Sequence, residues 1–403
     1  MTKATLLAIL FFSPIALAQQ NLQEAQELLL MGLATTKEII KNESLAWDKS
    51  FYQSLIEDDD ANIKLLGYTK ILSRSYGLDE KNSLQNIAIE LNSMLASEVL
   101  SPKSIATIDN LCFSTKLEPF CDHEALFARQ NKSMPDNASI YLQRFSLAYK
   151  DNNQDEIDQL IKNIAQSTYI DIHMYLHEGF RIKLEEYVKD NPFSKNELAM
   201  ENLLILGFLH PNSKESEEIS DNMENILIFV KVVVAKLREP IPSFKNIWEE
   251  CNNNEKHEQA CLKISELFIN KSKSLITALI GHKIKIEIFK QRGNSKELEQ
   301  AEASRDEYKN YYECVANIMN YRSPYISRKG VEFSKIAEPI EREFGEVALF
   351  ESLAKLNYDY YSLTDKNINN PENCKKKPQT EDRDRGQTRT SSSSTNTFNP
   401  LQK

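Results

Sequence analysis

Glycine is scarce in this chain. It accounts for 10 of the 403 residues, about 2.5%, where about 7% is usual. Glycine is the residue that adopts positive φ without strain, so tight hairpins and phosphate-binding loops depend on it. No two glycines lie closer together than Gly67 and Gly77. Dinucleotide loops, phosphate loops and the nucleophile elbow of serine hydrolases need closer glycines, so the sequence excludes those sites.

Long apolar runs and excess positive charge are also missing from the body of the chain. Its most apolar stretch, Ile226 to Ala235, has ten residues and contains Lys231, whereas a membrane-spanning helix needs about 20. The net charge is −10, and binding to nucleic acid or anionic membranes requires a basic face. We therefore expect no membrane span and no nucleic-acid partner.

The N-terminus has the pattern of a secretory signal peptide. Met1-Thr2-Lys3 is a short positive segment, Ala4 to Ile15 is apolar, and Ala16-Leu17-Ala18 is a small-residue cleavage site. We expect residues 1–18 to be removed on export. The residue directly after the cleavage site is Gln19 and not cysteine, which argues against a lipid anchor. The predicted location is the periplasm or the outside of the cell, where the mature protein would be soluble.

All six cysteines lie beyond the leader. In an oxidising compartment, two closely spaced cysteines that recur as a pair indicate local disulfides. Each predicted disulfide closes a loop of about ten residues and contributes roughly 2–3 kcal/mol on chain-entropy grounds. The predicted bonds are Cys112–Cys121 and Cys251–Cys261, while the remaining Cys314 and Cys374 either pair or stay free. Zinc held by Cys112, Cys121 and His123 is the less favoured alternative.

The cysteine pairs belong to a longer repeat. Cys112 and Cys251 are 139 residues apart, Cys121 and Cys261 are 140 apart, and Tyr169 and Tyr308 are again 139 apart. Asn131-Lys132-Ser133 also recurs 139 residues later as Asn270-Lys271-Ser272. We interpret residues 112–169 and 251–308 as the two units of a diverged internal duplication.

The low glycine content and the abundance of Leu, Ile, Glu and Lys favour an all-α fold. Apolar residues at helical spacing predict a series of amphipathic helices. These are expected over 21–41, 45–56, 63–75, 84–100, 138–149, 156–165 and 275–291, with three or four more over 169–236 and aromatic-rich helices after Tyr308. Residues 19–366 would form the helical region, and residues 367–403 a disordered polar tail.

Part of each unit resembles a tetratricopeptide-type repeat. Pro135-Asp136-Asn137 occupies the turn between repeats and Ala148-Tyr149 closes the first helix. The second helix is lined by Ile157, Leu160, Ile161 and Ala165, and Arg292-Gly293-Asn294 is the matching turn of the second unit. The resemblance implies stacked antiparallel helix pairs, an α-solenoid-like arrangement, with a concave binding surface. The chain is also similar to uncharacterised secreted helical-repeat proteins of Gram-negative bacteria, a resemblance that does not indicate any particular activity.

His173 and His177 are the weak candidates for a metal site. On a helix they would share one face, beside Asp171 and Glu178, and form half of a divalent-metal site. Their order does not match the zinc-protease motifs, which place the glutamate inside the pair, and a structural role is the preferred interpretation. The other histidines, His210, His257 and His282, are isolated in the sequence.

No catalytic motif is present, so we expect a non-catalytic scaffold that binds another protein and needs no cofactor. The first alternative is an enzyme whose site converges from distant helices, which predicts a pocket lined by clustered ionisable residues. The second is a helical protein that binds a metal or a small ligand. Tyr311-Tyr312 and Tyr358 to Tyr361 would line a ligand groove or, as the commoner case, belong to the core. The sequence does not give the oligomeric state.

Overall fold

The structure is a computed structural model, and the part of the chain that it describes is all-α, as the composition predicts. Within that part there is no strand, only the isolated bridges Asn137–Tyr169 and Ile170–Ser272. The described residues are 44–74, 80–96, 100–114, 117–173, 175, 177–194, parts of 224–235, 241–319 and 331–375.

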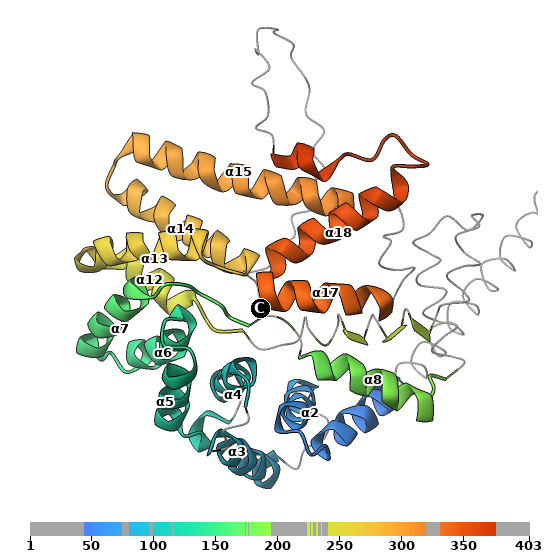
Figure 1. Ribbon diagram of the computed structural model, residues 1–403. Coiled ribbons are helices and arrows are strands. Elements are labelled where there is room, and N and C mark those ends of the chain that lie inside the picture. Colours follow the sequence, from blue (N-terminus) through green and yellow to red (C-terminus); the bar gives the residue numbers. More distant parts are fainter. Residues whose placement is uncertain are drawn as a thin grey trace, which may run out of the picture.

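Three helices pack together at the N-terminal end of the described chain. They are the helix over residues 44–56, α2 (Ala61–Arg74) and α8 (Glu178–Asp190), which lies beside α2 in Figure 1. Their shared core contains Phe51, Leu55, Phe180 and Leu184, all buried. The helix predicted over residues 45–56 is therefore present, and Phe51 and Leu55 lie on its buried face.

The helices from α3 to α7 form a group, named the first unit below, that begins before residue 112, where the predicted duplicated unit starts. Its elements are α3 (Glu80–Ala96), α4 (Pro102–Ser114), η1 (Glu118–Phe120), α5 (His123–Ser133), η2 (Ala138–Tyr141), α6 (Leu142–Lys150) and α7 (Gln154–Gln166). The α6–α7 hairpin matches the predicted helices over 138–149 and 156–165.

The second group of helices, named the second unit below, begins at residue 245. It contains α12 (Lys245–Asn253), η3 (Glu255–His257), α13 (Glu258–Asn270), α14 (Leu275–Gln291) and α15 (Ser295–Met319), and then α17 (Val331–Phe344), α18 (Glu346–Tyr361) and η4 (Pro371–Lys375). Helix α14 has the bounds that the sequence predicts. Helix α15 continues through Tyr308, so the predicted unit end at Tyr308 is not the end of a helix.

A single hydrophobic cluster joins the two groups. Helix α6 packs on α12 and α7 on α13, so Ile161 and Ile164 share a core with Ile264 and Phe268 (Figure 1). Burial of these side chains removes apolar surface from water and holds the first unit against the second.

Three disulfides join the six cysteines. The spacing-based prediction holds for Cys112–Cys121 and Cys251–Cys261, which close loops with sequence separations of 9 and 10. Cys314 and Cys374, which the sequence left open, bond to each other across 60 residues and fix η4 against α15.

The predicted tail begins too early. Residues 371–375 form η4, Cys374 is bonded, and Ile368 is buried, because the third disulfide holds this segment in a small core with α15 and α18. The signal peptide, the helix over 21–41, the tail beyond residue 375 and most of 195–240, including His210, lie outside the described residues.

Candidate functional site

The segment that carries His173 and His177 is not a helix. The residues described between 170 and 177 have no helical assignment, and α8 begins only at Glu178. His177 is the N-cap of α8, where its Nδ1 accepts a hydrogen bond from the amide of Gly179 at 3.2 Å. The helical face that we expected the two histidines to share does not exist, because His177 caps α8 and His173 lies in a non-helical connection before it.

His173 is buried at a junction of several elements. Its backbone has φ +52°, a conformation that few non-glycine residues adopt. Its carbonyl accepts a hydrogen bond from Lys103 at 2.6 Å, and its amide donates to the Asp171 carboxylate at 2.7 Å. Desolvation by burial lowers the pKa of His173 to about 4, although Asp171 acts in the opposite direction. The His173 ring is therefore neutral at pH 7, and we assign it a structural role.

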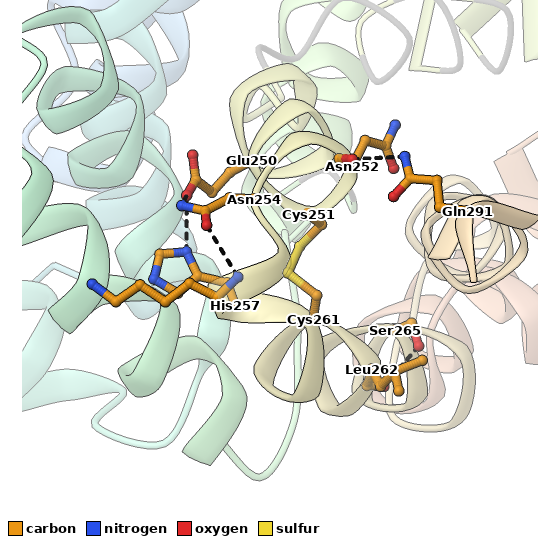
Figure 2. The surroundings of a disulfide bond; sticks show 10 residues. Glu250, Cys251, Asn252, Asn254, His257, Cys261, Leu262, Ser265 and Gln291 are labelled. Carbon is orange, nitrogen blue, oxygen red and sulfur yellow. Dashed lines mark hydrogen bonds and ion pairs between the residues drawn. A yellow bond between two sulfur atoms is a disulfide. The ribbon is translucent and has the colours of Figure 1, made fainter. Parts of the chain in front are cut away.

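His257 is not isolated in space. Its Nδ1 lies 2.8 Å from Glu250 and its Nε2 lies 2.9 Å from Asp158 of α7. The side chain is buried with 5% exposure beside the Cys251–Cys261 disulfide, where Figure 2 shows Glu250 and Asn254 around it. Because Asp158 belongs to the first unit, His257 connects the two units through carboxylates.

A metal centre finds no support in the described residues. In them, no three His, Cys, Asp or Glu side chains are grouped so that they could hold a metal ion. Cys112 and Cys121 are bonded to each other, so neither offers a thiolate to a zinc ion. His123 instead packs against Phe113, with ring centroids 4.8 Å apart.

The candidate site is a pocket of about 210 Å³ inside the first unit. Helices α4, α5, α6 and α7 all contribute to its wall, so it forms only when the unit is folded. Its volume is below the range of about 300–1,000 Å³ that holds drug-sized ligands. The ionisable lining consists of Asp109, His123, Glu124, Arg144, Asp151 and Glu156.

Asp109 of α4 is the most unusual residue of this pocket. It is 6% exposed, and Gln130 of α5 donates a hydrogen bond to its carboxyl at 3.0 Å. Desolvation by burial raises the pKa of Asp109 to about 7, while the Gln130 hydrogen bond acts against that increase. A carboxyl group with this pKa changes charge near neutral pH.

Arg144 of α6 supplies the positive charge of the pocket, and two carboxylates already neutralise it. Its Nε donates to Glu156 at 2.6 Å, its second contact is Glu124 at 3.2 Å, and its guanidinium lies 4.7 Å from the ring centre of Phe127. Asp109 and Asp151 remain as further acids in the lining. The pocket is therefore acidic when Asp109 is ionised.

Sequence reasoning missed Asp109, although a signal was present. It stands in the run Ile105-Ala-Thr-Ile-Asp-Asn-Leu-Cys112, where an acid interrupts an apolar helix. Residues 103–112 of α4 are all buried, so that acid had to face the interior. Arg144 and Glu156, which line the same pocket, carry no local signal, because helix packing alone brings them to it.

The predicted aromatic runs divide between core and surface. Tyr361 is buried, whereas Tyr311 and Tyr358 line a second pocket of about 340 Å³ between α15, α18 and η4. Among the described helices, none has the length and apolar character needed to cross a bilayer.

Scans against protein-family models, curated proteins and solved structures gave no match to this chain. The site therefore has to be interpreted from its own geometry.

Proposed function

We propose that this chain is an exported, non-catalytic binding protein that takes a positively charged side chain of a partner protein into the pocket of its first unit. The observation that carries the proposal is the buried Asp109 carboxyl on the wall of an acidic pocket. A bound ammonium or guanidinium group would favour the ionised carboxylate and so lower the pKa of Asp109. A pocket of 210 Å³ is suited to one side chain rather than to a large ligand.

Export is supported by the cysteines. All six are joined in disulfides, and such bonds persist in oxidising compartments such as the periplasm. The leader pattern at residues 1–18 points to the same compartment. A partner in that compartment would meet the protein with its disulfides formed.

The duplicated, repeat-like architecture is supported by two hairpin turns. In the α6–α7 turn Asn152 has φ +54° and the Asn153 amide donates to the Ala148 carbonyl at 2.9 Å. In the α14–α15 turn Gly293 has φ +65° and the Asn294 amide donates to the Phe289 carbonyl at 3.3 Å. Each pair of equivalent residues is 141 positions apart. Both turns thus end a helix with a residue in the left-handed conformation and with a hydrogen bond between equivalent positions.

The comparison of the units explains why the pocket belongs to the first one. By the offset of 139 that relates Cys112 to Cys251, Asp109 corresponds to Trp248, and by the offset of 141 that relates the two hairpins, Arg144 corresponds to Lys285. Lys283 Nζ lies 4.1 Å from the centre of the Trp248 ring. Under the proposed duplication, the second unit has a large aromatic ring where the first has a small acid, which supports placing the proposed binding in the first unit.

The enzyme alternative draws on the same residues. That hypothesis expects a pocket lined by clustered ionisable side chains, and this pocket has them. A carboxyl with a pKa of about 7 has the protonation behaviour of a general acid or base. We rank this function second, because Arg144 and Glu156 are engaged with each other and leave no nucleophile–base pair in the lining.

The test measures the binding of short capped peptides, each with a central lysine, arginine or glutamine. Binding is monitored by protein NMR at pH 6 and at pH 8. The lysine or arginine peptide should bind several-fold more tightly at pH 8, because Asp109 is then ionised. Asp109→Asn should reduce that affinity at least tenfold. The matched control Asp155→Asn removes the same charge from an exposed position outside the pocket and should change little.

Two results would overturn the proposal. The first is equal binding of the glutamine peptide, and the second is unchanged binding by Asp109→Asn. Turnover of a peptide by the wild type, lost in Asp109→Asn, would favour the enzyme alternative instead.

A further inference from the structure

The second pocket is formed by residues 311–375, later in the chain than the residues of the Asp109 pocket. Its walls come from α15, α18 and the short η4 segment, and its volume is about 340 Å³. The Cys314–Cys374 disulfide holds η4 in place, and Cys314, Cys374, Tyr311 and Tyr358 pack around one small core. The pocket therefore depends on a covalent link between segments 60 residues apart.

Each charged side chain of this pocket already has a partner within it, although its three carboxylates exceed its two lysines by one. Lys355 contacts Asp359 at 2.6 Å, and Lys375 lies 4.0 Å from Glu372. The third carboxylate, Glu351, accepts a hydrogen bond from the Tyr311 hydroxyl. A strongly charged ligand would have to displace one of these partners, so this pocket differs from the acidic pocket of the first unit.

The same side chains retain capacity for neutral polar groups. A carboxylate accepts about four hydrogen bonds and an ammonium group donates three, so a single ion pair leaves most of that capacity open. Ser352 donates to the Ala348 carbonyl at 2.8 Å and can still accept, and Asn370 accepts from the Glu372 amide at 2.9 Å and can still donate through its side-chain amide. The pocket thus offers donors and acceptors side by side, which matches hydroxyl groups because each of them does both.

Aromatic rings complete the arrangement. Tyr311 of α15 and Tyr358 of α18 are half-buried and line the pocket from two different helices. Aromatic rings offer large apolar faces with a negative electrostatic surface, which attract C–H groups. A ligand that fits must therefore combine apolar C–H faces with a rim of hydroxyl groups.

We propose that the pocket between α15, α18 and η4 binds a neutral saccharide of one or two rings. Sugar rings have the required combination of C–H faces and hydroxyl rims. The volume of about 340 Å³ lies near the lower end for small-molecule sites. This inference rests on residues separate from the Asp109 pocket and is independent of the function proposed above.

The experiment is saturation-transfer NMR on the full-length oxidised protein with glucose, galactose, N-acetylglucosamine and cellobiose. At least one sugar should receive saturation on its ring protons. Tyr358→Ala should weaken that binding at least tenfold by removing one aromatic wall. Cys314→Ser together with Cys374→Ser should also abolish it, because η4 is then released. Asp109→Asn should bind the sugar like the wild type, which separates this site from the first pocket.

The proposal is overturned if none of the four sugars receives saturation, or if Tyr358→Ala binds the sugar as well as the wild type does. Lys355→Ala provides a variant at a largely exposed side chain that should fold normally and bind severalfold more weakly. Unchanged binding by that variant would contradict the role given to the polar rim.

Discussion

Asp109 and His173 are two buried titratable residues with opposite effects on stability. Burial raises the pKa of Asp109 to about 7. As pH rises, the unfolded chain therefore loses this proton before the folded protein does, and folding stability falls from about pH 4 to pH 7. The pKa of His173 is lowered to about 4, so the unfolded chain gains its proton first as pH falls below 6.5. Stability from His173 therefore rises between about pH 4 and pH 6.5. In the wild type the two dependences oppose each other.

Replacing Asp109 with asparagine should expose the His173 dependence. The variant should gain stability from pH 4 to pH 6.5 and exceed the wild type at pH 7.5 by up to about 4 kcal/mol, because asparagine does not have to ionise in the buried position. The asparagine carbonyl still accepts the Gln130 hydrogen bond, so packing is retained. Urea unfolding at several pH values measures this, with Asp155→Asn as control. A variant profile parallel to that of the wild type would show that Asp109 is not the group responsible.

Replacing His173 with asparagine should shift the pH dependence in the opposite direction. Asparagine tolerates φ +52°, so the backbone is kept, while the titratable ring is removed. The loss of the buried ring lowers stability at every pH. On that lower baseline, the slope of unfolding free energy against pH between pH 4 and pH 6.5 should be more negative than in the wild type, because the contribution of His173 is gone. The contributions of Asp109 and of His282, whose pKa is also lowered by burial, are the same in both proteins. The slope of the urea-unfolding series is the readout, and a slope equal to that of the wild type would contradict the assignment.

At the scale of helices, the α6–α7 and α14–α15 hairpins use the same start signal. The Asn153 side chain accepts from the Glu156 amide and donates to the Glu156 carboxylate at 3.0 Å. The Asn294 side chain accepts from the Glu297 amide and donates to its carboxylate at 2.6 Å. Each asparagine satisfies an amide that the first turn of a helix leaves without a partner.

Asn153→Ala and Asn294→Ala should each destabilise the protein by about 1 kcal/mol, the usual cost of losing such a cap. Similar values are expected, because the two hydrogen-bond patterns are the same. Chemical unfolding measures both, and Gln159→Ala, an exposed change in the middle of α7, should stay within about 0.5 kcal/mol of the wild type. A cost at only one position would argue against equivalent hairpins.

Helices with a local signal could be predicted, and segments fixed by distant contacts could not. Helix α14 is apolar over its length and stops before Gly293, so its bounds were visible in the sequence. The histidines at 173 and 177 have helical spacing, yet the Ile170 amide is bonded to the Lys271 carbonyl at 3.3 Å. The side-chain amide of Asn137 also donates to the Asp171 carbonyl at 2.9 Å. Contacts across 101 and 34 residues thus outweighed the local preference.

At the scale of the whole molecule, the sites depend on how the helices assemble. Asp109, Arg144 and Glu156 come from α4, α6 and α7, and they meet only after those helices pack. Cys314 and Cys374 likewise meet only when η4 reaches α15. The local pairs Cys112–Cys121 and Cys251–Cys261 were predictable from their short spacing, because a loop of about ten residues closes readily.

The covalent state of the whole chain provides the most direct test of export. Protein purified from its own host, denatured and treated with an alkylating agent without reductant, should show no alkylated cysteine, because all six are bonded. The same mass spectrum should lack residues 1–18. Reduction before alkylation is the control and should add six labels. Six labels without reductant, together with a retained leader, would place the chain in a reducing compartment. The thiols would then be free, the pocket wall made by η4 would lose its link, and zinc binding by Cys112, Cys121 and His123 would again be a competing explanation.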